Sequence, residues 1–169
     1  MIKVVLTGPE CSGKTTLSES IATKLCAPLV QEYAREYLNN LKRDYCYADL
    51  LKIAKGQVEL EKKTIDNNPH AKLIICDTNI QVLKMWSQIK YSKCDPFILH
   101  NQDIHSFYIL CSPEFTWEHD PLRENPNNRM ALFKKYYQDL QQEKYNFIIA
   151  KGSNNTRISY VIDNIMQML

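Results

Sequence analysis

The stretch of sequence that decides the fold is IKVVLTGPECSGKT, residues 2–15. It opens with a mostly apolar, branched run, which is typical of a buried strand. Gly8 and Gly13 follow, and Lys14 and Thr15 then lead into a helical pattern at residues 16–25. The order of strand, glycine-containing loop and helix is the context in which a loop of this composition binds phosphate.

The loop, residues 8–15, has the pattern G-x-x-x-x-G-K-[ST] and is called the phosphate loop below. Its glycines allow backbone N–H groups to converge on phosphate oxygens at the positive end of a helix. Lys14 supplies a cation for the β and γ phosphates, Thr15 a hydroxyl for Mg²⁺, and Thr16 a contact with the α phosphate. We therefore expect ATP and Mg²⁺ as ligands. The predicted nucleotide-binding residues of this region are Gly8, Glu10, Cys11, Ser12, Gly13, Lys14, Thr15 and Thr16.

Bulk composition limits the class of protein. With 169 residues, 44% of them hydrophobic and 24% charged, the chain predicts one domain over residues 1–169. A net charge of +2 argues against the broad basic face of a nucleic-acid binder. No apolar run is long enough to span a bilayer, and the six scattered cysteines have neither metal-clip nor disulfide spacing. We expect a cytoplasmic protein with no nucleic-acid or membrane partner; the sequence specifies no oligomeric state.

Strand-like and helical patterns alternate along the chain. The strand-like runs cover residues 2–6, 28–31, 72–76, 107–111 and 147–150. The helical patterns cover residues 16–25, 47–65, 79–89, 130–143 and 159–169. This alternation predicts an α/β fold of the P-loop NTPase type, with three αβα layers and a five-stranded parallel sheet. The polar, proline-containing stretch at residues 112–128, called the lid segment below, predicts a short exposed lid.

An acidic residue, Asp77, ends the apolar run Leu73-Ile74-Ile75-Cys76. The carboxyl ends of parallel strands meet at one edge of a sheet, so we expect Asp77 beside the phosphate loop. There it can hold a metal ion together with Thr15. Capping of the following helix is an alternative role for Asp77, and one residue can serve both.

Two features favour a kinase over a G protein. Asp77 is followed by Thr78-Asn79-Ile80, and the guanine-specific motif of G proteins is missing from the sequence. A kinase also needs an acceptor site and a lid that excludes water. The Glu32-Tyr33-Ala34-Arg35-Glu36 block after the second strand suits the acceptor site, because Glu32 can accept the proton of a hydroxyl. Helix capping or an ordinary surface charge is the alternative for Glu32.

Two arginines and a tryptophan lie in the lid segment or directly after it. Arg123 and Arg129 bracket residues 125–128, and a guanidinium there can stabilise charge on a transferred phosphoryl group. Ordinary solvated arginines are the alternative. Trp117 needs a cover, which a stacked ring or a neighbouring helix would supply. The predicted catalytic residues are Lys14, Glu32, Asp77, Arg123 and Arg129.

Four blocks together resemble the ribosylnicotinamide kinase domain of NadR-type proteins. They are residues 8–16, residues 32–37, the strand ending in Asp77-Thr78, and residues 117–123 with Arg129 beyond. The resemblance implies a P-loop kinase that transfers phosphate from ATP to nicotinamide riboside, giving nicotinamide mononucleotide in NAD salvage. It implies a small-molecule nucleoside as partner. The predicted riboside-binding residues are Glu32, Tyr33, Arg35, Trp117 and Asp120.

The sequence differs from the NadR-type pattern at one lid position and in what precedes the phosphate loop. Pro121 stands where the family often has glycine, and its fixed backbone angle can change how the lid closes. Multifunctional members carry DNA-binding and adenylyltransferase regions ahead of the kinase; the phosphate loop starts near Met1, so we expect those functions to be absent.

Related kinases place the loop after the fifth strand against adenine. We therefore expect backbone contacts from residues 152–157 and stacking by Arg157, with a helix-capping turn as the alternative. Two other functions stay open for the whole chain: a P-loop kinase of another nucleoside or small hydroxyl metabolite, and a nucleotide-sensing ATPase module that drives a partner.

Overall fold

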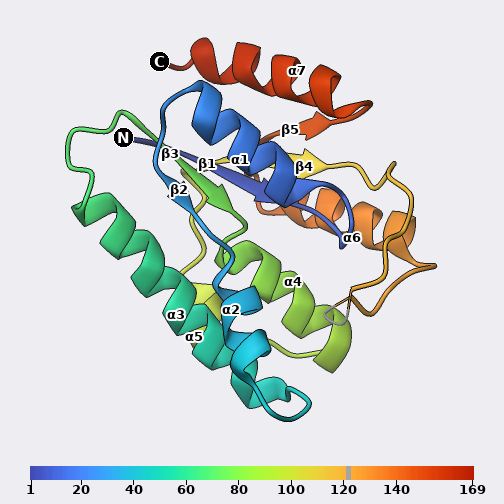
Figure 1. Ribbon diagram of the computed structural model, residues 1–169. Coiled ribbons are helices and arrows are strands. Elements are labelled where there is room, and N and C mark those ends of the chain that lie inside the picture. The colour runs from blue at the N-terminus through green and yellow to red at the C-terminus, as the bar shows by residue number, and fades with distance from the viewer. Residues whose placement is uncertain (121–122) are drawn as a thin grey trace.

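The computed structural model describes residues 1–120 and 123–169, in which strands and helices alternate (Figure 1). The strands are β1 (Ile2–Thr7), β2 (Leu29–Val30), β3 (Leu73–Asp77), β4 (Phe107–Cys111) and β5 (Asn146–Ala150). The helices are α1 (Lys14–Lys24), α2 (Tyr33–Asn40), α3 (Tyr47–Asp66), α4 (Ile80–Tyr91), α5 (Pro96–His100), α6 (Arg129–Gln142) and α7 (Asn154–Met166).

The strands form one parallel sheet with β1 at its centre. Their order is β2-β3-β1-β4-β5, and Leu6 of β1 pairs with Asp77 of β3 and with Ile109 of β4. The chain crosses β1 when it passes from β3 to β4, so its winding direction changes there. Parallel α/β sheets bind ligands beyond the carboxyl ends of their strands at such a point.

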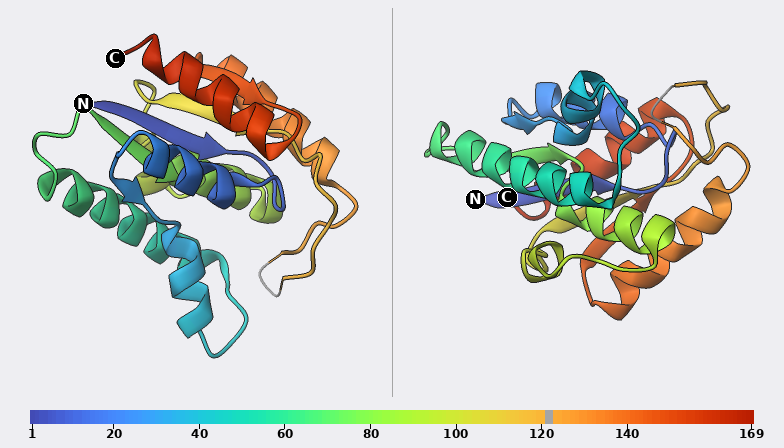
Figure 2. Two further views of the ribbon diagram at one scale, coloured as in Figure 1. Left: turned by 45° about the horizontal axis from the view of Figure 1, so that its top comes forward. Right: turned by 90° about the horizontal axis from the view of Figure 1, so that it is seen from below.

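Helices cover both faces of the sheet, as Figure 2 shows. All residues of β3 and β4 are buried, which is expected of strands that are covered on both sides. One face packs on α1 and α7 through Ile21 and Val161, and the other packs on α4 and α6 through Met85 and Leu140. These layers confirm the predicted three-layer α/β fold with a five-stranded parallel sheet.

Several element boundaries differ from the sequence-based expectation. The strand at residues 107–111 matches β4, but α2 and the five-residue α5 were not predicted because each is too short to show a helical period. Helix α7 begins at Asn154 instead of residue 159. The first residues of α7 are polar, which is more typical of a loop than of a helix. Ser153 nevertheless caps the helix by accepting a hydrogen bond from the Thr156 N–H at 3.3 Å.

The lid segment contains neither helix nor strand at residues 112–120 and 123–128. Pro121 lies outside the described residues. The segment leaves the end of β4, passes near one end of α4 and returns to α6 (Figure 1). Its function as a lid stays a prediction.

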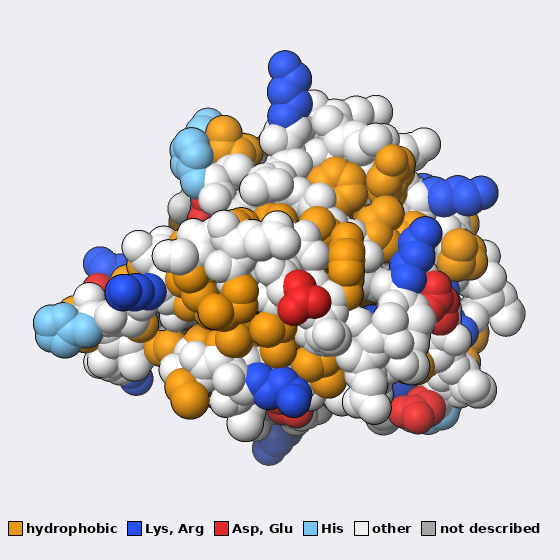
Figure 3. Space-filling model, turned by 90° about the horizontal axis from the view of Figure 1, so that it is seen from above, with side chains coloured by type: hydrophobic (Ala, Val, Ile, Leu, Met, Phe, Trp, Pro, Cys, Tyr) orange, Lys and Arg blue, Asp and Glu red, His pale blue; other side chains and the backbone are white. Residues whose placement is uncertain are grey.

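One face of the surface, on the side of α7, is partly hydrophobic. Figure 3 views this side, where hydrophobic side chains adjoin one another near the centre and basic and acidic side chains are scattered around them. On α7, Tyr160 and Met166 are exposed. Among the described helices, none has both the length and the hydropathy needed to cross a membrane.

Helices α2 and α3 meet at a glycine. The ring of Tyr33 lies against Gly56, so closely that a Cβ atom at Gly56 would overlap the ring. The Tyr33 N–H also donates to Oε1 of Gln57 at 2.9 Å. Gly56 therefore allows α2 to lie directly on α3.

We predict that Gly56→Ala lowers the free energy of unfolding by about 1–3 kcal/mol through overpacking. Alanine is ordinarily better than glycine in a helix interior by about 1 kcal/mol, so the expected sign is opposite to that of helix propensity. In a Tyr33→Ala background the same substitution should raise the free energy of unfolding. Urea denaturation measures both, and stabilisation by Gly56→Ala with Tyr33 intact would contradict the contact.

Candidate active site

The phosphate loop connects β1 to α1 with a left-handed backbone at three positions: φ is 130° at Gly8, 52° at Cys11 and 78° at Gly13. The two glycines are also close to neighbours. A Cβ atom would lie 2.8 Å from the Cys111 carbonyl oxygen at Gly8, and 2.6 Å from Cε2 of Phe115 at Gly13. Both positions therefore require glycine for space as well as for conformation.

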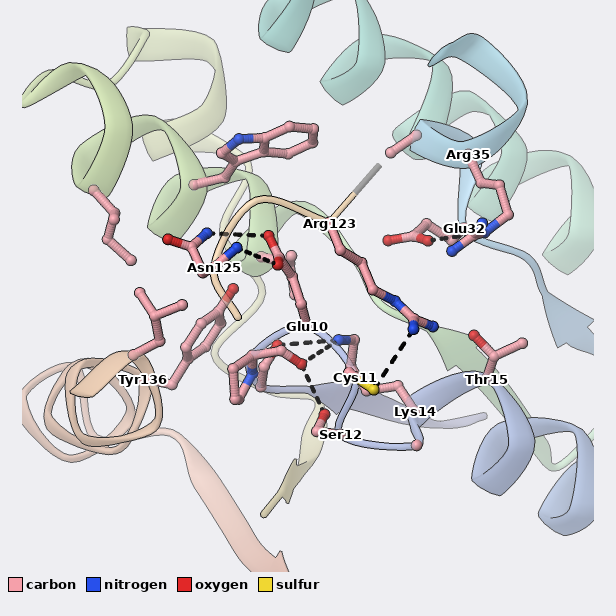
Figure 4. Close-up of a pocket in the computed structure, with 18 of the residues that line it drawn as sticks. Glu10, Cys11, Ser12, Lys14, Thr15, Glu32, Arg35, Arg123, Asn125 and Tyr136 are labelled. Atoms are coloured by element: carbon pink, nitrogen blue, oxygen red, sulfur yellow. Dashed lines mark hydrogen bonds and ion pairs between the residues drawn. The ribbon is translucent and has the colours of Figure 1, made fainter. Parts of the chain in front are cut away.

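Two side chains fold back onto the phosphate loop. The Ser12 hydroxyl donates to the Pro9 carbonyl at 2.8 Å, and Nζ of Lys14 donates to the carbonyls of Gly8 at 3.1 Å and Pro9 at 2.9 Å. The Lys14 ammonium thus lies over the loop, as Figure 4 shows. It is placed to meet an anionic group that enters the loop.

Asp77 lies at the end of β3, next to the phosphate loop, and is 2% exposed. Its Oδ1 atom is buried and has no hydrogen-bond partner among the described residues. Burial raises the pKa of Asp77, and the neighbouring Thr15 hydroxyl and Lys14 ammonium partly offset this. Asn79, not Asp77, caps α4, because its side chain accepts a hydrogen bond from the Gln81 N–H at 2.9 Å.

A magnesium ion fits this arrangement. Mg²⁺ is typically bound by one or two protein oxygens together with phosphate oxygens and water. Thr15 and the unsatisfied oxygen of Asp77 provide such a pair. The described residues contain no cluster of three or more His, Cys, Asp or Glu side chains that could hold a metal alone, so a bound nucleotide would have to complete the site.

Glu32 is placed across the pocket from the phosphate loop, just before α2. It occupies the N-cap position of α2, but its side chain makes no capping hydrogen bond in the described structure. Burial raises the pKa of Glu32, while Lys14 lowers it and Asp77 raises it further. Nε of Arg35 lies 3.8 Å from Oε2 of Glu32. The carboxylate is therefore positioned for a role other than helix capping.

Arg123 of the lid segment and Arg129 at the start of α6 both reach Cys11 of the phosphate loop. Nη1 of Arg123 lies 3.5 Å from the Cys11 sulfur and donates to the Glu118 carbonyl at 2.6 Å. Nη1 of Arg129 donates to the carbonyls of Phe115 at 2.7 Å and Cys11 at 3.3 Å. Figure 4 shows Arg123 extending across the pocket, whereas Arg129 is not among the residues that line it.

These residues surround a cavity of about 220 Å³. Its polar side is formed by residues 8–16, Glu32, Arg35, Arg123 and Asn125. Its other side, called the apolar wall below, is formed by Ala34, Leu38, Val82, Trp86, Ile89, Leu132 and Tyr136. A cavity with a phosphate-binding loop at one end and an apolar wall at the other can hold a nucleoside-like molecule next to a polyphosphate.

Three of the predicted riboside-binding residues do not line the cavity. The Tyr33 ring packs on Gly56 of α3, and its role at the substrate stays a prediction. Trp117 lies near the guanidiniums of Arg123 and Arg129, with its ring centroid 6.0 Å and 5.7 Å away. Asp120 pairs with Arg35 of the cavity at 3.1 Å. Roles for Trp117 and Asp120 at the substrate stay predictions.

Arg157 requires a correction. It is 1% exposed, and its guanidinium donates to the carbonyls of Ser12, Ser112 and Gly152 at 2.8–2.9 Å. It also lies 4.4 Å from the centroid of the Phe115 ring. This burial contradicts the prediction that Arg157 stacks on adenine, because its side chain is enclosed and its donors are already used inside the protein.

The sequence does not predict that the residues of the apolar wall line a cavity. Val82, Trp86 and Ile89 lie on α4, and Leu132 and Tyr136 lie on α6. Their spacing of three and four residues places each group on one helix face, and such a face is ordinarily assigned to the core. A tryptophan on that face was the one available signal, because its N–H needs a partner when it is buried.

Comparison with known proteins agrees with this fold. The structure is similar to a NadR protein solved in complex with NR, with a TM-score of 0.83 and 18% identity, over 98% of this chain and 51% of that chain. It is similar to deoxyadenosine kinase from M. mycoides, with a TM-score of 0.72 and 16% identity, over 98% of this chain and 100% of that chain. Thymidylate kinase from Ehrlichia chaffeensis gives a TM-score of 0.70 and 16% identity, over 97% and 98% of the two chains.

The chain thus spans about half the length of the NadR protein. A search of curated protein sequences finds no match. The family model described as AAA domain matches residues 3–157. Since this match covers most of the chain, the chain belongs to this AAA domain family.

Proposed function

We propose that this chain transfers the γ phosphoryl group of ATP to a hydroxyl of nicotinamide riboside and so forms nicotinamide mononucleotide, a step of NAD salvage. One observation carries the proposal: a single cavity joins the phosphate loop and Glu32 to an apolar wall that contains Trp86 and Tyr136. Such a cavity suits an acceptor with a planar ring at one end and a reactive hydroxyl at the other.

The choice of nicotinamide riboside has narrower support. The sequence resembles NadR-type kinases at four blocks, and the similar NadR structure was solved with NR. Deoxyadenosine kinase and thymidylate kinase share the fold and act on other nucleosides or nucleotides. The proposal of a phosphotransferase is therefore supported by the cavity and the fold. The proposal of nicotinamide as the ring of the acceptor is supported by the resemblance.

Six polar residues in or next to the cavity would each have a task in this reaction. Glu32 orients the acceptor hydroxyl and takes up its proton as the oxygen attacks. Lys14 and Arg123 stabilise the negative charge on the transferred phosphoryl oxygens. Arg129, which holds the backbone of Cys11 and Phe115, keeps the lid segment against the phosphate loop. Thr15 and Asp77 would hold Mg²⁺, which when bound neutralises charge on the phosphate oxygens.

We predict that Lys14→Ala lowers kcat by at least about 100-fold, because a charge that stabilises the transition state is lost. The assay is coupled ADP release in the presence of nicotinamide riboside. Lys24→Ala, at the exposed last turn of α1, is the matched control and should keep the wild-type rate. A normal rate in Lys14→Ala would remove the phosphate loop from the mechanism.

Glu32→Gln should lower kcat by about 10²–10⁴, the usual contribution of a general base, and change KM for ATP little. The control is Glu36→Gln, one turn further along α2 on its exposed side. Equal losses in both variants would show that charge near α2, and not the position of Glu32, matters.

The pH dependence follows from the environment of Glu32. Because burial raises the pKa of Glu32, its carboxyl group keeps a proton to a higher pH than an ordinary glutamate does. As the pH falls, kcat/KM should therefore decline at a pH above the ordinary glutamate range. The same acid limb should be absent in Glu32→Gln; an unchanged limb there would assign it to another group.

The substrate is tested by an ADP-release screen over nicotinamide riboside, adenosine, deoxyadenosine and thymidine, with product masses checked. We expect ATP consumption to rise with nicotinamide riboside and to yield its monophosphate. Preference for another nucleoside would replace the substrate and keep the reaction class. Equal ATP turnover with and without every acceptor would contradict a kinase and favour an ATPase module.

A further inference from the structure

Glu124 and Asn125 of the lid segment are held from the phosphate-loop side by Glu10. The backbone N–H groups of Glu124 and Asn125 each donate to Oε2 of Glu10 at 2.9 Å. The Asn125 side-chain amide donates to the other oxygen, Oε1, at 3.1 Å (Figure 4). A carboxylate that accepts several N–H bonds from one short segment fixes that segment's position, because such bonds are charge-assisted.

The same residues are held from the apolar-wall side by Tyr45. Oε1 of Glu124 accepts hydrogen bonds from the Tyr45 hydroxyl and from Nζ of Lys90, each at 2.8 Å. The Tyr45 hydroxyl in turn accepts a hydrogen bond from Nε1 of Trp86 at 2.9 Å. Trp86 is part of the apolar wall.

Tyr45 can make these bonds together because it stays protonated. Burial raises the pKa of Tyr45 to about 12, so its hydroxyl keeps the proton that it donates to Glu124 while it accepts from Trp86. The Tyr45 and Trp86 rings also meet edge to face, with centroids 4.9 Å apart. The indole ring is thereby held in one orientation.

Arg123 stands at the end of this connection. It directly precedes the two backbone N–H groups that bind Glu10, and its guanidinium lies 3.5 Å from the sulfur of Cys11 in the phosphate loop. The three consecutive residues thus have different contacts. Arg123 faces the phosphate loop, Glu124 binds Tyr45, and Asn125 lines the cavity.

We propose that Tyr45 and Glu124 are positioning residues, which act through the backbone bonds to Glu10 to set the Arg123 guanidinium over the phosphate loop. The proposal rests on the proposed function for its kinetic consequence, because it assigns Arg123 to the transferred phosphoryl group. It connects the part of the cavity that holds the acceptor ring to the part where transfer takes place.

The contribution of Glu124 to folding stability is expected to be small. Lys90 is 34% and Glu124 is 42% exposed, and ion pairs this exposed contribute little to folding free energy. Glu124→Ala should therefore unfold at nearly the wild-type urea concentration. A purely structural role would then leave catalysis unchanged as well.

The kinetic test is a double-mutant cycle of Glu124→Ala and Arg123→Ala. Glu124→Ala alone should lower kcat about tenfold and change KM for ATP less than about twofold. The double variant should be no slower than Arg123→Ala, because residues that act through each other do not add. The matched control is Glu118→Ala, which removes a lid-segment carboxylate that makes no hydrogen bond in the described structure and keeps the carbonyl that binds Arg123. Additive losses, or a wild-type kcat in Glu124→Ala, would overturn the proposal.

A second measurement separates this proposal from the proposed function. NMR-detected hydrogen exchange of the Glu124 and Asn125 amides needs no substrate. We expect both amides to be protected in the wild-type protein and to exchange at least about tenfold faster in Glu124→Ala and Tyr45→Phe, but not in Glu118→Ala. Unchanged exchange in the first two variants would overturn the positioning role, whether or not nicotinamide riboside is a substrate. Faster exchange in a protein that fails the nucleoside screen would keep the role and reject the function.

Discussion

The architecture of the site depends on one buried guanidinium. Arg157 binds carbonyl groups from three parts of the chain that are far apart in sequence: the phosphate loop at Ser12, the start of the lid segment at Ser112, and the start of α7 at Gly152. A buried cation is tolerated only when its donors are satisfied, so these carbonyls must converge. In a trans peptide the C=O and the next N–H point in opposite directions, and Arg157 therefore turns the Gly13 N–H away from itself.

A second buried network sets the position of the apolar wall. The Thr7 hydroxyl donates to Oε1 of Gln81 at 2.6 Å, and Nε2 of Gln81 donates to Asp139 at 2.9 Å. Nζ of Lys84 lies 2.7 Å from the other oxygen of Asp139. This network connects the end of β1 to α4 and α6, the helices that carry most of the apolar wall. Satisfied buried polar groups favour one arrangement over others, so the wall and the phosphate loop are fixed relative to each other.

The sequence predicts features that depend on neighbouring residues and misses those that depend on distant ones. The phosphate loop and β4 are readable because motif and apolar run are local. Arg157 was misplaced because its carbonyl partners come from three separate segments. Trp86 and Tyr136 were missed because only packing decides whether an apolar helix face meets the core or a cavity. Asp77 was placed correctly at a strand end, but the neighbour that caps α4, Asn79, was not distinguished from it.

The two tryptophans of the chain both lie at the site. Trp86 belongs to the apolar wall, and Trp117 of the lid segment lies near the guanidiniums of Arg123 and Arg129. Selectively excited indole emission from this protein therefore originates at two places: the apolar wall of the cavity, and the lid segment next to Arg123. Intrinsic fluorescence can consequently follow ligand entry and lid-segment rearrangement without any attached dye, and replacing either tryptophan by phenylalanine assigns the signal to one of these places.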